Sequence, residues 1–200
     1  MKKYSGFTLI ELMITLFIVG ILLTVGVPSM KTFMQSNQLI ASTNELISAF
    51  HVARSEAIKQ NSRVTICESS DGKTCATTGS WREGWIVFVD ANGDLANTGA
   101  PCAALNTDCL LRVHDQIDSP DFSLAGEDAN SATVSSITFT SRGLPKSNVG
   151  DAESAIFSVC SYDSSSTGAN LLGSRAVVLG FSGRVRVSDN TAIINCPVTP

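Results

Sequence analysis

The first thirty residues hold the feature that most restricts the fold, an apolar segment long enough to cross a membrane. Nearly every residue from Phe7 to Val27 is apolar, and these 21 residues would form a helix about 30 Å long. That length matches the hydrocarbon core of a bilayer. Two lysines precede the segment, which predicts a cytoplasmic N-terminus with the rest of the chain on the other side. We therefore expect an N-terminal membrane anchor.

One carboxylate, Glu11, lies inside this apolar segment. An acid placed there costs a few kcal/mol in lipid, so it indicates a function and a specific partner. An ordinary secretory signal peptide is the alternative, but it needs small residues at a cleavage site after its apolar stretch. The chain has no alanine before Ala41. The pattern therefore favours a retained anchor whose acid has a partner.

The segment Gly6-Phe7-Thr8-Leu9-Ile10-Glu11 resembles the processing motif of type IV pilins and type II secretion pseudopilins. The resemblance implies that a prepilin peptidase removes the leader 1–6 by cutting after Gly6, and that Phe7 is then methylated. It also implies that Glu11 pairs with the Phe7 amine of a neighbouring subunit during assembly. Such a pair would satisfy two charges in one low-dielectric site.

The same resemblance implies where the protein lies and what it contacts. The subunit would be held in the bacterial inner membrane by residues 7–28, with its head in the periplasm, and would later reach a pilus at the cell surface. Its partners would be membrane lipid, other major and minor pilin subunits, the prepilin peptidase and the inner-membrane assembly platform.

Helical periodicity continues after Pro28, where we expect a kink or local break. Small and apolar residues recur at spacings of three and four, and they predict one buried stripe: Leu39, Thr43, Leu46, Phe50, Ala53 and Ala57. Residues 29–61 are therefore predicted to form an amphipathic helix that continues the anchor. The rod from Phe7 to Lys59 would contain 53 residues and measure roughly 80 Å. Its apolar stripe requires a sheet to cover it.

The remainder, residues 62–200, is predicted to be a β-rich head. Alternating segments separated by Gly, Asn, Asp and Ser turns predict strands at 63–67, 85–89, 110–114, 134–140, 155–160, 175–181 and 184–187. A long helix followed by strands is an α+β order. The resemblance implies a type IV pilin-like fold, in which the long N-terminal helix packs on an antiparallel sheet. Residues 95–135 match no pattern that we can name.

All six cysteines lie in the head. An even number behind a hydrophobic N-terminus predicts disulfides formed in an oxidising compartment. Six cysteines allow 15 connectivities. Proximity favours two short loops, and the remaining pair would then join the C-terminal tail to a central strand: Cys67–Cys75, Cys102–Cys109 and Cys160–Cys196.

Two further stretches are similar to one branch of the family, the FimT/GspH-type minor pilins and pseudopilins. Residues 53–61 (ARSEAIKQN) resemble its helix-end signature, although each residue also suits an ordinary helix end. Residues 81–90 (WREGWIVFVD) resemble the tryptophan-glycine strand that runs into an Asp/Asn/Gly turn.

The element Gly183-Arg184-Val185-Arg186 is the strongest candidate binding site. In a strand Arg184 and Arg186 would share one face about 7 Å apart, a spacing that matches successive phosphates of one nucleic-acid strand. Arginine binds phosphate oxygens with two parallel hydrogen bonds. Three more basic residues could extend the patch: Arg142, Lys146 and Arg175. In FimT-like proteins a Gly-Arg-x-Arg element is associated with DNA binding in natural transformation.

The alternative is a solvated strand face whose arginines pair with Asp189 or Glu153. Charge also limits the DNA hypothesis. The formal net charge is −4, and loss of the leader with Lys2 and Lys3 makes it −6. Two to four phosphate contacts would give weak, salt-sensitive, non-specific binding.

Other chemistry is sparse. The segment Asp90-Ala91-Asn92-Gly93-Asp94 resembles the start of a calcium loop, but Leu95 and Pro101 stand where an EF-hand needs Gly and Glu. We interpret it as a turn and expect no metal or cofactor. No hydrolase, phosphate-loop or dinucleotide motif is present, so we expect no enzyme activity. Three functions remain: a structural minor pilin, a DNA-binding minor pilin, or a type II secretion pseudopilin.

Overall fold

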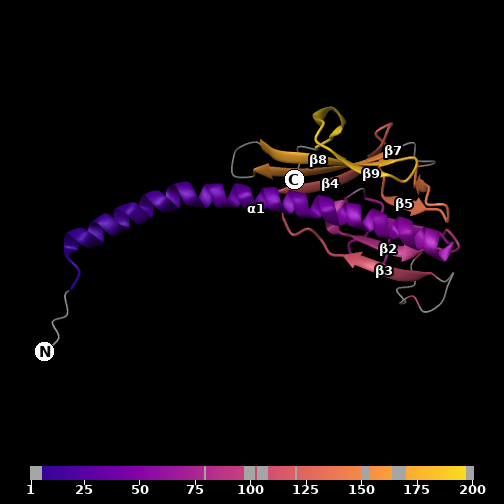
Figure 1. Ribbon diagram of the computed structural model, residues 1–200, viewed down its shortest axis with the longest axis horizontal. Helices are drawn as coiled ribbons and strands as arrows, with labels where there is room; N and C mark the ends of the chain where they lie inside the picture. Colours follow the sequence, from indigo (N-terminus) through magenta and orange to yellow (C-terminus); the bar gives the residue numbers. More distant parts are fainter. Residues whose placement is uncertain are drawn as a thin grey trace. The chain divides into compact units, whose positions relative to one another are not determined.

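The structure is a computed structural model that describes residues 6–78, 80–96, 102, 108–119, 121–149, 154–163 and 170–196 (Figure 1). It divides into two compact units, Met1–Asn37 and Gln38–Pro200. One helix is followed by strands, which confirms the α+β order. The elements are α1 (Leu9–Gln60), β1 (Val64–Glu68), β2 (Trp85–Val89), β3 (Cys109–His114), β4 (Phe122–Asp128), β5 (Ser136–Phe139), β6 (Pro145–Ser147), β7 (Ser154–Asp163), β8 (Asn170–Gly180) and β9 (Val185–Ser188), with short 3-10 turns at Trp81–Glu83 and Thr191–Ile193.

The first unit consists of the N-terminal part of α1. Its best 18-residue window has a mean hydropathy of 2.5 and is not buried in the protein, so length and composition suit a membrane crossing. The helix continues without interruption through Pro28, so the predicted local break is wrong. Proline removes one backbone donor, and the helical hydrogen bonds on either side are sufficient to maintain the helix.

In the second unit the predicted helix stripe is confirmed. All six of its residues are buried and the larger ones join the main core. Phe50 lies at the centre, with its ring 6.5 Å from Phe139 in β5 and 5.0 Å from Phe157 in β7. Because one aromatic side chain contacts both sheets, the helix, β5 and β7 share a single core.

Two antiparallel sheets form the head. One has the strand order β3-β2-β1-β5-β6 and the other has the order β4-β7-β8-β9. Their inner faces supply the core, for example Ile66 and Val87 from the first sheet and Val159 and Val177 from the second. Among the residues whose burial is described, the buried apolar ones lie at or after Leu39, so the second unit has a core of its own.

The sequence missed two strands. β4 ends in Gly126-Glu127-Asp128, and β6 begins at Pro145, and these residue types are poor strand formers. Pairing with other strands stabilises both segments as strands: β4 pairs with β7 along its whole length, and β6 pairs with β5. β7 and β8 are longer than the predicted strands 155–160 and 175–181, because both extend into the segment between them. Residues 164–169 lie outside the described residues.

All three predicted disulfides are present. Cys67–Cys75 covers a second small apolar cluster on the outer face of the first sheet, with Ile86 and Phe88. Cys160–Cys196 ties the C-terminal segment to the outer face of β7. There the backbone N–H of Asn195 donates to Ser158 Oγ at 3.0 Å.

Candidate functional site

The N-terminal motif shows how the helix begins. Thr8 precedes the first helical residue, and its Oγ1 accepts a hydrogen bond from the backbone N–H of Glu11 at 3.3 Å. The spacing Thr8-x-x-Glu11 is that of a capping box. The sequence reading missed this role for Thr8. Phe7 is 83% exposed and the Glu11 carboxylate is exposed among apolar neighbours. The side chains of Phe7 and Glu11 are therefore not covered by the rest of the described chain.

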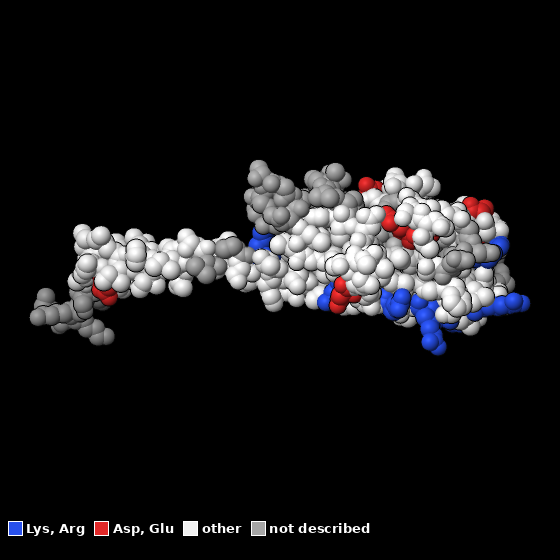
Figure 2. Space-filling view, turned by 90° about the horizontal axis from the view of Figure 1, so that it is seen from above, with Lys and Arg blue, Asp and Glu red and all other residues white. Residues whose placement is uncertain are grey.

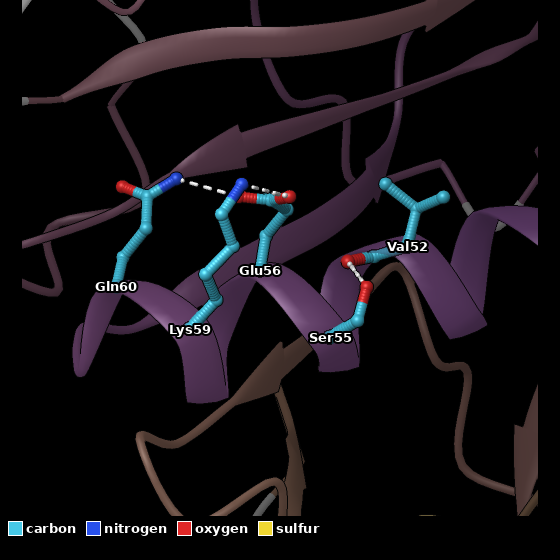
Figure 3. A network of polar contacts seen from close by, with 5 residues as sticks. All are labelled: Val52, Ser55, Glu56, Lys59 and Gln60. Carbon is cyan, nitrogen blue, oxygen red and sulfur yellow. Dashed lines mark hydrogen bonds and ion pairs between the residues drawn. The ribbon is translucent and has the colours of Figure 1, made fainter.

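The signature at the end of α1 contains a local polar network (Figure 3). The Glu56 carboxylate accepts hydrogen bonds from Gln60 Nε2 at 2.9 Å and Lys59 Nζ at 3.2 Å. The Gln60 hydrogen bond, with help from Lys59, lowers the pKa of Glu56 despite partial burial. Asn61 then adopts a positive φ of 47°, and Ser62 N–H donates to the Ala57 carbonyl. Such a left-handed residue closes a helix.

Arg54, from the same signature, extends away from the helix to a hairpin. Its Nη1 donates to the carbonyl oxygen of Gly183 at 2.8 Å and its Nη2 donates to that of Ser182 at 3.0 Å. Its Nε is buried and has no partner among the described residues. From the sequence, Arg54 suits an ordinary helix end. Only the resemblance of residues 53–61 to the family signature indicated a further role for Arg54.

The hairpin that Arg54 holds is one of two similar turns, which we call the paired turns (residues 140–144 and 180–184). In each, the third loop residue is a glycine at φ +74°, Gly143 or Gly183. In each, the glycine N–H donates to the carbonyl three residues earlier, at 2.8 Å. A three-residue loop that ends in a left-handed glycine is a standard hairpin connection. A Cβ on Gly183 would lie 2.4 Å from the Gly143 carbonyl oxygen, so the paired turns are in direct contact.

Four of the five basic residues predicted for the binding site lie at or next to the paired turns. Arg184 closes the second turn, and Arg186 pairs with Val178 across β8 and β9. Both arginines are exposed, and alternation puts them on the same outer face of the sheet. Arg142 is exposed in the first turn, and Lys146 is exposed on β6, the strand that follows it.

Arg175 is not part of this group. It pairs with Val159, a core residue, and therefore points to the inner side of the sheet. Its Nε lies 3.9 Å from Asp189 Oδ1. Asp189, which we considered as a partner for Arg184 and Arg186, is thus the partner of Arg175. Glu153, the second candidate, lies outside the described residues.

Among the described residues, no ion pair involves Arg142, Arg184 or Arg186. Ion pairs described there include Lys59–Glu56, His114–Glu45 and Arg175–Asp189. Figure 2 shows several Lys and Arg side chains along one margin of the visible face, with one acidic side chain near them and other acidic side chains scattered elsewhere. The paired turns therefore present guanidinium groups that are available to an anionic partner.

The Asp90 turn uses its oxygens internally. Asp90 is buried and accepts hydrogen bonds from Thr65 Oγ1 at 3.0 Å and Gly93 N–H at 2.8 Å. Asn92 and Asp94 bond each other and the following backbone. Within the described residues no group of three metal-ligating side chains forms. The segment thus has the internally bonded turn that we preferred to a calcium loop.

The other signature stretch is structural. Trp81 Nε1 donates to the Val134 carbonyl at 2.7 Å, and its ring packs edge-on against Phe157. The His114 ring stacks on Trp85 at 3.7 Å between centroids, and its Nε2 lies 2.8 Å from Glu45 Oε2. These contacts join β2 and β3 to α1. An open cavity of about 580 Å³ beside His114 is lined by residues of the segments 69–73 and 113–116, with Glu83 and Leu110.

Comparison with known proteins gives two family matches. Residues 1–27 match the prokaryotic N-terminal methylation motif. Residues 42–183, more than half of the chain, match the family model described as type II transport protein GspH. No curated protein sequence matches the chain.

Two solved structures are similar in fold. Both are crystal structures of the type IV minor pilin FimU of Pseudomonas aeruginosa. The first is 22% identical with a TM-score of 0.51, covering 78% of this chain and 92% of that one. The other crystal form is 21% identical with a TM-score of 0.48, covering 74% and 90%.

A methylation-type N-terminus on a long helix, joined to an antiparallel β head, defines a membrane-anchored subunit of the pilin type. Such subunits associate with other pilin subunits and are substrates of the prepilin peptidase. More particularly, the chain belongs to the GspH family. It is therefore a minor pilin or pseudopilin, in a family of structural proteins.

Proposed function

We propose that this subunit is a minor pilin that binds DNA through the paired turns, as part of DNA uptake in natural transformation. The observation that carries the proposal is the fixed, accessible position of Arg184 and Arg186. Both extend from one face of a hairpin whose turn is held by Arg54, and neither pairs with a described carboxylate. Residues two apart in a strand match the spacing of successive phosphates.

The contacts of the site are those of non-specific backbone binding. Gly183 allows the turn, Arg184 and Arg186 bind phosphates, and Arg142 and Lys146 can contact the strand on either side. With a formal net charge of −6 after leader removal, one subunit would bind weakly and lose affinity steeply with salt. Several subunits in one filament would bind the same DNA with higher avidity.

The membrane-proximal part of the proposal follows from the N-terminal motif. The prepilin peptidase would remove residues 1–6, residues 7–28 would span the inner membrane with the N-terminus cytoplasmic, and residues 29–61 would connect this anchor to the periplasmic head, residues 62–200. Glu11 would pair with the Phe7 amine of a neighbour while the assembly platform adds the subunit to the filament.

A mobility-shift titration of the full chain in detergent micelles tests DNA binding. The variants Arg184→Ala and Arg186→Ala should each weaken binding to all sequences and lower the salt slope by about one. Arg175→Ala is the matched control, because Arg175 points to the inner side of the same sheet and pairs with Asp189. No shift by the unaltered chain at low salt, or equal loss in the control, would refute DNA binding at this site.

A type II secretion pseudopilin is the second candidate, favoured by the family match over residues 42–183. Its partners would be protein subunits only. The same titration separates the two functions, because a pseudopilin of this kind should give no DNA shift at any salt concentration.

A further inference from the structure

Phe181 is the most exposed of the large apolar side chains described in the second unit, at 75%. The other phenylalanines of that unit, for example Phe139 and Phe157, are buried. An aromatic ring left in water at the tip of a hairpin gains nothing from the core. A single exposed apolar side chain is common on protein surfaces, so the position of Phe181 in the fold decides what it indicates.

The position of Phe181 connects it to the basic group. It is the first loop residue of the 180–184 turn, and Arg184 closes the same turn through its carbonyl, which accepts from Gly180 N–H at 2.9 Å. The carbonyls of Ser182 and Gly183, the two residues that follow Phe181, accept hydrogen bonds from Arg54. The backbone that carries the ring is thus fixed from both ends before any ligand arrives, which limits the entropy lost on binding.

We propose that Phe181 stacks on an unpaired base, and that the ligand of the paired turns is therefore single-stranded nucleic acid or a frayed end. This inference rests on the DNA-binding function proposed above. Arg184 at the end of the turn and Arg186 on β9 would bind successive phosphates while the ring of Phe181 stacks on a base of the same nucleic-acid strand. Bases of an intact duplex already stack on each other, whereas single strands offer their faces to aromatic side chains.

A tryptophan reporter tests the stacking. Both native tryptophans, Trp81 and Trp85, are buried, so Phe181→Trp adds one exposed indole to the full chain in micelles. Single-stranded oligothymidine should quench its emission, and an abasic oligonucleotide of the same length should not. Leu171→Trp, at an exposed site on β8, is the control and should stay unquenched by either.

Affinity provides the second measurement. Phe181→Ala should weaken binding of single strands about fivefold or more and leave duplex binding and the salt slope unchanged, because no charge is lost. Phe181→Tyr should restore the affinity.

Two results overturn the inference while DNA binding stands: equal affinity of the unaltered chain and Phe181→Ala for single strands, or equal quenching by abasic and thymidine oligonucleotides. A shift in indole emission on self-association without DNA also overturns it, because Phe181 would then be a protein contact. No binding of any DNA by the unaltered chain contradicts the proposed function itself.

Discussion

Arg54→Ala is the substitution that most directly tests how the head holds the 180–184 turn. The guanidinium donates two hydrogen bonds, at 2.8 and 3.0 Å, to the Gly183 and Ser182 carbonyls. Hydrogen bonds to charged groups contribute about 1.5–3 kcal/mol each, so their loss costs about 3–6 kcal/mol. The substitution also removes Nε, which is buried without a described partner, and this returns about 1–3 kcal/mol. The midpoints of these two ranges give a net loss of about 2.5 kcal/mol.

Urea denaturation of a fragment starting at Ser29 measures this loss, since the fragment contains the buried apolar residues that the structure describes. Arg54→Lys keeps the charge but cannot donate two parallel hydrogen bonds, so its loss should be intermediate. Lys59→Ala on the same helix is the control, because its exposed pair with Glu56 contributes at most about 0.5 kcal/mol. If Arg54→Ala destabilises the fragment no more than Lys59→Ala does, the reasoning is refuted.

Three further results are expected. Gly183→Ala should destabilise the fragment by at least about 2 kcal/mol, because its φ is +74° and the new methyl would lie against the Gly143 carbonyl; an unchanged urea midpoint would contradict this. The double variant Cys160→Ser, Cys196→Ser opens a loop with a sequence separation of 36 and should lower stability by about 3–4 kcal/mol; a loss below about 1 kcal/mol would contradict it. Backbone hydrogen bonds to its carboxylate lower the pKa of Asp71 well below the ordinary value. The native fragment should therefore exceed Asp71→Asn in stability by the full amount at neutral pH, and this difference should shrink as the pH falls below about 4. A stability difference that does not depend on pH would refute the lowered pKa.

Sequence periodicity was sufficient for the helix and its buried face, because residues such as Leu46 and Phe50 repeat at helical spacing and have no other way to be covered. Disulfide pairing followed from proximity. β4 and β6 could not be predicted, because long-range pairing with β7 and β5 overrides weak local preferences.

The site was partly predictable for a similar reason. Alternation alone predicts that Arg184 and Arg186 share one face, and the register of β8 and β9 sets Arg186 opposite Val178. Alternation within one strand carries no information about where another strand points, so the inward orientation of Arg175 needed the pairing with β7. The contact between Arg54 and the 180–184 turn joins segments almost 130 residues apart, and no local pattern encodes it.

Mass spectrometry of the mature N-terminal peptide, from protein made in a host with its prepilin peptidase, tests the central claim that this chain is a processed pilin-type subunit. The account predicts a peptide that begins at Phe7 and carries a single methyl group on its amine. A mature chain that begins at any other residue, or an unprocessed Met1, would contradict it.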